Sequence, residues 1–84
     1  MAHGLVLTGE LRRVKLVHIR PDEGDWFDQW QIVIDTGADY LQRVVVRRGD
    51  EELAALLQGH EGEHVSLEVS VGNFRKLWLE RVLS

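Results

Sequence analysis

The chain contains no cysteine and a single proline among its 84 residues. Because neither a disulfide nor a thiolate-bound metal can form, a hydrophobic core must stabilise a domain that is close to the lower size limit. No apolar run is long enough to span a membrane, and the first residues lack the basic leader of a signal peptide. We therefore expect one domain over residues 1–84, cytoplasmic, with no membrane contact and no cofactor.

Positive charge is also scarce, since 10 Lys and Arg face 14 Asp and Glu, which gives a net charge of −4. This balance argues against a nucleic-acid partner, because non-specific affinity depends on cations that meet phosphates. The distribution argues the other way: the cations fall within apolar runs, whereas most acids fall in residues 22–28, 50–52 and 61–63. A basic patch on an acidic protein is one interpretation, and ordinary surface charge on edge strands is the other.

Residues 26–48 hold the strongest pattern in the chain. Two runs rich in β-branched and aromatic residues flank residues 35–39, Asp-Thr-Gly-Ala-Asp, whose chemistry suits a turn. The pattern predicts a β-hairpin with one face toward the core and one toward water. The alternation assigns Trp30, Ile32, Ile34, Val44 and Val46 to the core face, and Gln29, Gln31, Val33, Arg43, Val45 and Arg47 to the outer face.

The remaining segments also have clear patterns. Residues 4–20 predict a long strand that bends past Gly9, where the apolar residues change register. Residues 50–58 predict a short helix with Asp50 as its N-cap, and residues 64–72 alternate strictly, as in a strand. A last strand is expected over residues 74–83, after a turn at Gly72 and Asn73. Val65, Leu67, Val69 and Val71 are expected to face inward, and the apolar residues that form the other patterns are Leu5, Leu7, Leu11, Val14, Leu16, Leu53, Leu56, Leu57, Leu77 and Leu79.

Together the segments predict a mainly β fold, a five-stranded antiparallel barrel with one short α-helix between strands three and four. Residues 9–11 (Gly-Glu-Leu), 30–37 (Trp-Gln-Ile-Val-Ile-Asp-Thr-Gly) and 62–69 (Gly-Glu-His-Val-Ser-Leu-Glu-Val) resemble parts of small OB-fold nucleic-acid-binding domains. Residues 71–83 are similar to the closing hairpin of the small single-stranded-DNA-binding proteins of filamentous phages. The resemblance implies an OB-like barrel that binds single-stranded nucleic acid, single-stranded DNA in particular, without catalysis.

Single strands are bound by stacking their bases on aromatic faces while Lys and Arg follow the backbone. We therefore look for outward-facing cations, amides and aromatic rings on strands one to three and the last strand, flanked at the loops by Trp26 and Tyr40. The alternative is that Trp30, Phe74 and one other Trp are buried in the core; we expect burial for Trp30 and leave it open for Trp78. The predicted binding residues are Arg13, Lys15, Phe27, Gln29, Gln31, Arg43, Arg47, Lys76 and Trp78.

Two motifs suggest chemistry that the rest of the chain does not support. Residues 32–39 resemble the active-site signature of retroviral-type aspartic proteases, in which two chains each supply one Asp. Those enzymes need a Gly-rich flap where this chain has a predicted helix and a charged loop, so we expect Asp35 to be a turn residue. His60 and His64 have the spacing of two metal ligands on a helix, but two glycines interrupt the helix there, and His3 and His18 lie far from them. We predict no catalytic residue and no metal site.

A function of another class remains open. A small barrel with exposed Trp and Val side chains is also typical of a protein-interaction module, either with another protein or with itself as a homodimer. The net charge favours this alternative, whereas the position of the cations favours nucleic acid.

Overall fold

The computed structural model describes residues 4–83. Its longest element, β1 (Leu5–Ile19), pairs with β4 along its first part and with β2 along its second part. A register shift between Leu11 and Arg13 separates the two parts, and it allows both Leu11 and Val14 to be buried. The bend thereby lets one strand pair with two different neighbours, β4 and β2. The predicted bend is confirmed, although it lies closer to Leu11 than to Gly9.

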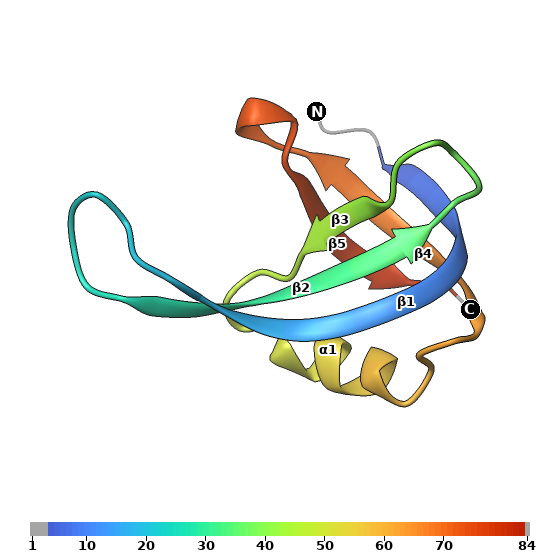
Figure 1. The fold of residues 1–84 in the computed structure, drawn as a ribbon, viewed down its shortest axis with the longest axis horizontal. Helices are drawn as coiled ribbons and strands as arrows, with labels where there is room; N and C mark the ends of the chain where they lie inside the picture. Colours follow the sequence, from blue (N-terminus) through green and yellow to red (C-terminus); the bar gives the residue numbers. More distant parts are fainter. Residues whose placement is uncertain (1–3, 84) are drawn as a thin grey trace.

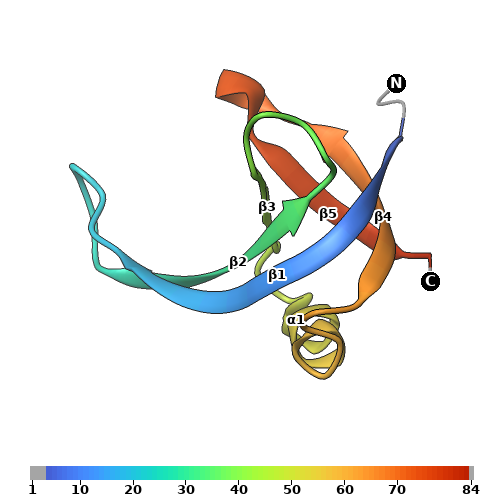
Figure 2. The same cartoon turned by 45° about the vertical axis from the view of Figure 1, so that its right-hand side comes forward.

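The other strands are β2 (Phe27–Asp35), β3 (Gln42–Val45), β4 (His64–Val71) and β5 (Leu77–Val82). All five strands belong to one sheet that closes on itself in the order β1-β2-β3-β5-β4 (Figures 1 and 2). The predicted mainly β architecture of five strands and one α-helix is confirmed. The expectation of an antiparallel sheet is wrong at one pair, because β3 and β5 run parallel. A closed ring with an odd number of strands cannot alternate direction at every pair, so a parallel pair is unavoidable.

The helix α1 (Glu51–Gln58) lies between β3 and β4 in the chain and covers one end of the ring (Figure 1). Ala54 and Leu57 are buried, and Leu53 packs against the same core. Leu56 was expected in this stripe but is exposed, because it lies about a third of a turn away from the buried face. In the part of the chain that the structure describes, no helix has both the length and the apolar character needed to cross a bilayer.

The second half of β1 and the first half of β2 extend beyond the ring as a two-stranded hairpin arm, residues 16–30 (Figure 1). Because the arm lacks a third strand, Leu16 is exposed although its register predicts burial. Leu5 and Val71, at the outer ends of β1 and β4, are exposed for a similar reason, since each lies where its ladder ends. Apolar alternation alone therefore overestimates the core at strand ends.

Two residues expected on the wet face are buried instead. Gln31 is 9% exposed and Val45 is 4% exposed. Gln31 and Val45 are paired with each other across β2 and β3. Lys15 of β1 lies beside Gln31 and Trp78 of β5 lies beside Val45, so a larger side chain flanks the pair on each side. The outer face at this pair is therefore partly covered.

Phe74 was expected at the start of the last strand, with burial in the core as one alternative, and neither is the case. It lies in a short 3₁₀ turn, η1 (Asn73–Arg75), and its side chain is 100% exposed. The turn is closed by a hydrogen bond of 2.7 Å from the Gly72 N–H to the Lys76 carbonyl, and β5 begins only at Leu77. Both Phe74 and Arg75 have a φ of 59°, so the reversal of the chain projects Phe74 into solvent.

Gly9 lies where β1 passes the end of β2, and we predict that this contact tolerates no side chain. A Cβ atom at Gly9 would lie 2.7 Å from the Asp35 carbonyl carbon and 2.9 Å from the Thr36 Cα. Because backbone must move to relieve the overlap, Gly9→Ala should lower the free energy of unfolding by about 1–3 kcal/mol, measured by urea denaturation.

Gly59→Ala is the matched control, because its backbone φ is −73° and its nearest neighbour is the Leu56 carbonyl oxygen at 3.7 Å. It should change stability by less than about 0.5 kcal/mol. Equal effects of the two substitutions would contradict the close approach at Gly9.

Candidate functional site

Cations and aromatic side chains share one outer face of the sheet. The strand pairing aligns residues of β1, β2, β3 and β5 into rows that cross this face. With adjacent strands about 4.8 Å apart, the longest row spans roughly 14 Å along the sheet. The two rows are Lys15-Gln31-Val45-Trp78 and Arg13-Val33-Arg43.

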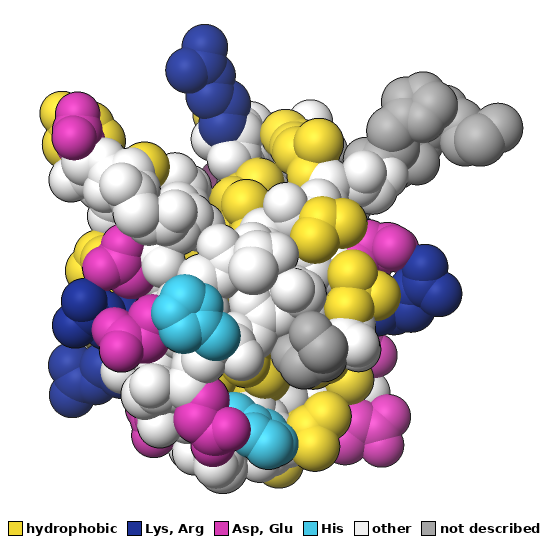
Figure 3. Space-filling view, turned by 90° about the vertical axis from the view of Figure 1, so that its right-hand side faces the viewer, with side chains coloured by type: hydrophobic (Ala, Val, Ile, Leu, Met, Phe, Trp, Pro, Cys, Tyr) yellow, Lys and Arg dark blue, Asp and Glu magenta, His cyan; other side chains and the backbone are white. Residues whose placement is uncertain are grey.

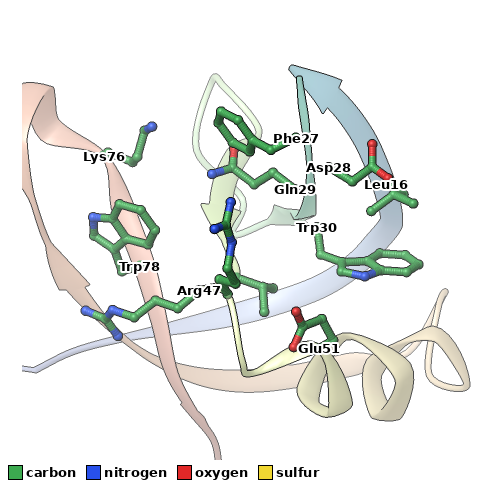
Figure 4. A pocket seen from close by; sticks show the side chains of 11 residues that line it. Leu16, Phe27, Asp28, Gln29, Trp30, Arg47, Glu51, Lys76 and Trp78 are labelled. Atoms are coloured by element: carbon green, nitrogen blue, oxygen red, sulfur yellow. The ribbon is translucent and has the colours of Figure 1, made fainter. Parts of the chain in front are cut away.

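A groove of about 490 Å³ opens beside Trp78, and we call it the Trp78 groove (Figure 4). Phe27 and Gln29 project from β2 on one side, and Lys76 and Trp78 lie on the other side, at β5. Arg48, in the connection between β3 and α1, also lines the groove. The groove thus brings Phe27, Lys76 and Trp78 together, as the sequence led us to expect of residues on neighbouring strands.

Trp78 is held in position by three neighbours. The guanidinium carbon of Arg47 lies 5.4 Å from the centroid of the indole ring, and Lys76 Nζ lies 5.5 Å from it, both within the range of a cation–π contact. Gly72 lies against the edge of the ring, since a Cβ atom there would be 2.8 Å from Trp78 Cδ1. The indole is therefore fixed by its surroundings before any ligand arrives.

Arg47 was predicted to point outward toward a ligand, but its charge is already compensated. Its Nη1 donates to Glu80 Oε2 at 2.6 Å, and its Nη2 donates to Ser70 Oγ at 3.2 Å. The side chain is half-buried between these acceptors and the face of Trp78. We therefore revise its role: Arg47 positions Trp78 and contributes little net charge to the surface.

A second hollow, of about 430 Å³, lies over the other row, and we call it the basic cleft. It is lined by Arg13, Lys15 and Arg43, with Val33 and Leu41 between them. Among residues 4–83, none of these three cations forms a salt bridge. Their positive charge is therefore available to an anionic ligand.

The neighbouring Arg12 differs from these cations because carboxylates neutralise it. Its Nε lies 2.7 Å from Glu10 Oε1, and its Nη2 lies 2.9 Å from Asp35 Oδ2. The hydrogen bond to Asp35 and the charge of Glu10 raise the pKa of Arg12 above its usual value. Arg12, on β1, therefore also lines the basic cleft, but its charge is compensated by Glu10 and Asp35.

The two hollows differ in charge. The lining of the basic cleft contains no acid among the described residues, whereas Asp28 and Glu51 both line the Trp78 groove. Backbone N–H groups of Glu51 itself and of Gly49 hold the pKa of the Glu51 carboxyl below its usual value, so it is anionic at neutral pH. Arg47, Arg48 and Lys76 also line the Trp78 groove, so the groove carries both signs of charge, whereas the charged residues that line the basic cleft are all cations. The cleft therefore has the more uniform positive charge, and the groove is distinguished by its aromatic side chains.

Not every predicted residue reaches these hollows. Gln31 is buried, and its Nε2 donates to Gln29 Oε1 at 3.3 Å, so Gln29 is the amide that borders the Trp78 groove. Trp26 lies on the arm, where it stacks on His18 with ring centroids 4.5 Å apart. Tyr40 is exposed in the loop between β2 and β3 and lines neither hollow.

Arg48 and Leu16 line the Trp78 groove and were not among the predicted residues. The guanidinium carbon of Arg48 lies 6.0 Å from the centroid of the Phe27 ring. A pair of this kind has no signature in the sequence, because it depends on how the arm curves toward the connection after β3. The run of cations at the end of β3 was the only available signal for Arg48.

Asp35 has the contacts of a turn residue. Its Oδ1 accepts the Gly37 N–H at 2.9 Å, and this bond, together with the hydrogen bond from Arg12, holds the pKa of Asp35 below its usual value. His60 lies in the loop after α1, where its Nδ1 is 3.4 Å from Glu63 Oε2. Within the described part of the chain, no three His, Cys, Asp or Glu residues gather as metal ligands, and His3 lies outside that part.

Comparison with known proteins adds no relative: no protein-family model, no curated protein and no solved structure matches this chain.

We predict that Arg47→Ala destabilises the protein, because it removes both the bond to Glu80 and the support of Trp78. The loss should be about 1–2 kcal/mol in urea denaturation, with a reduced near-ultraviolet circular dichroism signal from tryptophan. Arg43→Ala is the matched control, because Arg43 is exposed and forms no salt bridge among residues 4–83, and it should cost less than about 0.5 kcal/mol. Equal costs would contradict a positioning role for Arg47.

We also predict an acid-dependent contribution from Asp35. Because its pKa is lowered in the folded state, its charge stabilises the fold above the unfolded pKa of about 4, and this contribution is lost as pH falls through the folded pKa. Asp35→Asn should therefore be less stable than the wild type at neutral pH, and the difference should shrink below about pH 4. Urea denaturation at a series of pH values measures it, and a difference that does not vary with pH would contradict the charge effect.

Proposed function

We propose that this protein is a non-catalytic binding module for single-stranded nucleic acid, built on an OB-like barrel. The observation that carries the proposal is the presence of the basic cleft and the Trp78 groove on adjoining parts of the sheet. Single-strand binding requires cations along a backbone path and aromatic faces for the bases, and the two hollows supply one each. The element order and the closed five-stranded sheet support the OB-like assignment.

The division of charge suggests how a strand would lie. Phosphates would contact Arg13, Lys15 and Arg43, whose charge is not compensated by neighbouring acids. A base would turn into the Trp78 groove, where Trp78 offers a stacking surface and Gln29 offers an amide to the edge of the base. A duplex keeps its bases paired and stacked, so it could use only the basic cleft, and we expect a preference for single strands.

The proposal predicts a salt-dependent affinity for single-stranded oligonucleotides, measured by electrophoretic mobility shift or fluorescence anisotropy. Each contact to a phosphate releases counterions, so three or four contacts should give a slope of log K against log salt of roughly −2 to −3. Arg43→Ala should weaken binding and flatten the slope by about 0.7. Single-stranded DNA is the first ligand to test.

Arg81→Ala is the matched control for this prediction. It removes the same charge, but Arg81 lies on β5 and is paired with Glu68 of β4 at 2.8 Å, away from both hollows. Its slope should equal that of the wild type. If Arg81→Ala and Arg43→Ala have the same effect, binding is governed by net charge and the basic cleft is not the site.

Replacement of Trp78 tests the groove separately from the cleft. Trp78→Leu retains an apolar side chain against Gly72 but removes the aromatic face, so it should cost about 1–3 kcal/mol of binding free energy and leave the salt slope unchanged. Thermal unfolding of the variant establishes that it is folded. If the wild type forms no complex with oligonucleotides at low salt, the protein-interaction alternative replaces this proposal.

A further inference from the structure

Phe74 occupies a position that suits neither its side chain nor its backbone. The side chain is wholly exposed at the tip of η1, and the backbone φ of 59° lies in the left-handed region. Bulky residues rarely adopt this conformation, whereas Gly and Asn adopt it readily. The same holds for the next residue, Arg75, which has the same φ. A bulky aromatic residue held in this way indicates a contact outside the folded monomer.

An apolar cleft opens at the other end of the molecule, between α1, the start of β4 and the end of β5. It has a volume of about 350 Å³, which is at the lower end of the range for ligand pockets. Leu56 and Leu83 are 52% and 46% exposed at its edge, and Val65 and Val82 lie between them. On the face in Figure 3, hydrophobic side chains lie mainly above and to the right of two histidines, and acidic side chains lie directly beside those histidines.

The charges around these two features are complementary. Phe74 is followed by Arg75 and Lys76, both exposed and without a salt bridge in the described chain. The cleft has Glu63 at its rim, beside His60 and His64, and the last turn of α1, which forms one wall, contains no Lys or Arg. An aromatic side chain flanked by cations therefore matches an apolar cleft with a carboxylate at its rim.

We propose that the Phe74 loop of one copy of this chain, residues 73–76, docks in the apolar cleft of a second copy. The loop and the cleft lie at opposite ends of the ring, with the orange loop above β5 and α1 below in Figure 1, so they cannot meet within one molecule. The contact is head to tail, and each dimer retains one free loop and one free cleft. Assembly therefore continues into a chain of copies unless a ring closes.

The contact does not depend on nucleic acid and can be tested without it. One aromatic side chain in one cleft buries less area than a standard interface, so association should be weak and visible at high protein concentration. Sedimentation equilibrium should show the average mass of the wild type rising with concentration to at least twice that of the monomer. A wild type that stays monomeric throughout would overturn the proposal.

Two substitutions separate the loop from the cleft. Phe74→Asn removes the aromatic side chain but suits the left-handed backbone, so it should abolish association without lowering the melting temperature. Leu56→Lys places a cation in the cleft opposite Arg75, while Glu52 one turn earlier compensates it on the surface of α1. Tyr40→Asn is the matched control, because Tyr40 is also a largely exposed aromatic in a loop, and it should associate like the wild type.

A mixture of the two variants gives the most specific result. Phe74→Asn retains an intact cleft and Leu56→Lys retains an intact loop, so each alone should be monomeric and an equimolar mixture should form a dimer and nothing larger. A mixture that stays monomeric, although the wild type associates, would show a symmetric contact and overturn the head-to-tail proposal. Unchanged association of folded Phe74→Asn would also overturn it, and Phe74→Gly serves as a second variant at that position.

Discussion

Two residue pairs, Val44 with Leu77 and Val45 with Trp78, join β3 to β5 and close the sheet. This seam is shorter than the antiparallel ladders around the rest of the ring, and backbone pairing stops at the end of β3. Arg47, two residues beyond β3, continues the connection with its side chain, which donates to Glu80 on β5 and Ser70 on β4. The seam and Arg47 together fix β5, and hence Trp78, against the rest of the sheet.

The same seam determines where the sheet can bind a ligand. Beyond it, β2 continues into the arm while β3 turns into the connection to α1, so the two strands part and leave the Trp78 groove between the arm and β5. In the other direction along the strands, Arg13 and Arg43 of the second row lie close to Lys15, which begins the first row, because β1, β2 and β3 remain paired there. The cations of the basic cleft lie close together because β1, β2 and β3 are paired there, and the space beside Trp78 is open because the pairing of β2 with β3 ends at Gln31 and Val45.

The sequence was sufficient to predict the elements and the residues of the central core. Ile32, Ile34, Leu67 and Leu79 are fully buried, as period-two alternation indicates. Alternation fails where a residue's surroundings depend on a distant strand. Val45 is covered because β5 lies beside β3, and the parallel direction of that pair follows from closure and not from any local pattern. Length and periodicity therefore predict elements better than they predict how a ring closes.

The candidate site was predictable to a similar extent. Arg13, Lys15 and Arg43 lie on neighbouring strands, and alternation places them outward, as the structure does. The role of Arg47 could not be predicted, because its partner Glu80 is 33 positions away and meets it only through the seam. Phe74 was misassigned because an aromatic residue before an alternating run resembles the start of a strand, whereas backbone conformation decides that it ends a turn.

The β4–β5 turn connects the two surfaces that we propose. Lys76 borders the Trp78 groove, and Phe74 lies two residues before it at the tip of the same turn. A head-to-tail contact at Phe74 would order this turn and reduce the freedom that Lys76 loses when a strand binds. Self-association and strand binding would then favour one another, because the protein loses less conformational entropy when a ligand binds a site that is already ordered. A polynucleotide spanning successive copies adds the effect of a raised local concentration. Under the two proposals, weak self-association would be sufficient for cooperative binding along a strand, because the strand itself would supply the proximity that the protein contact lacks.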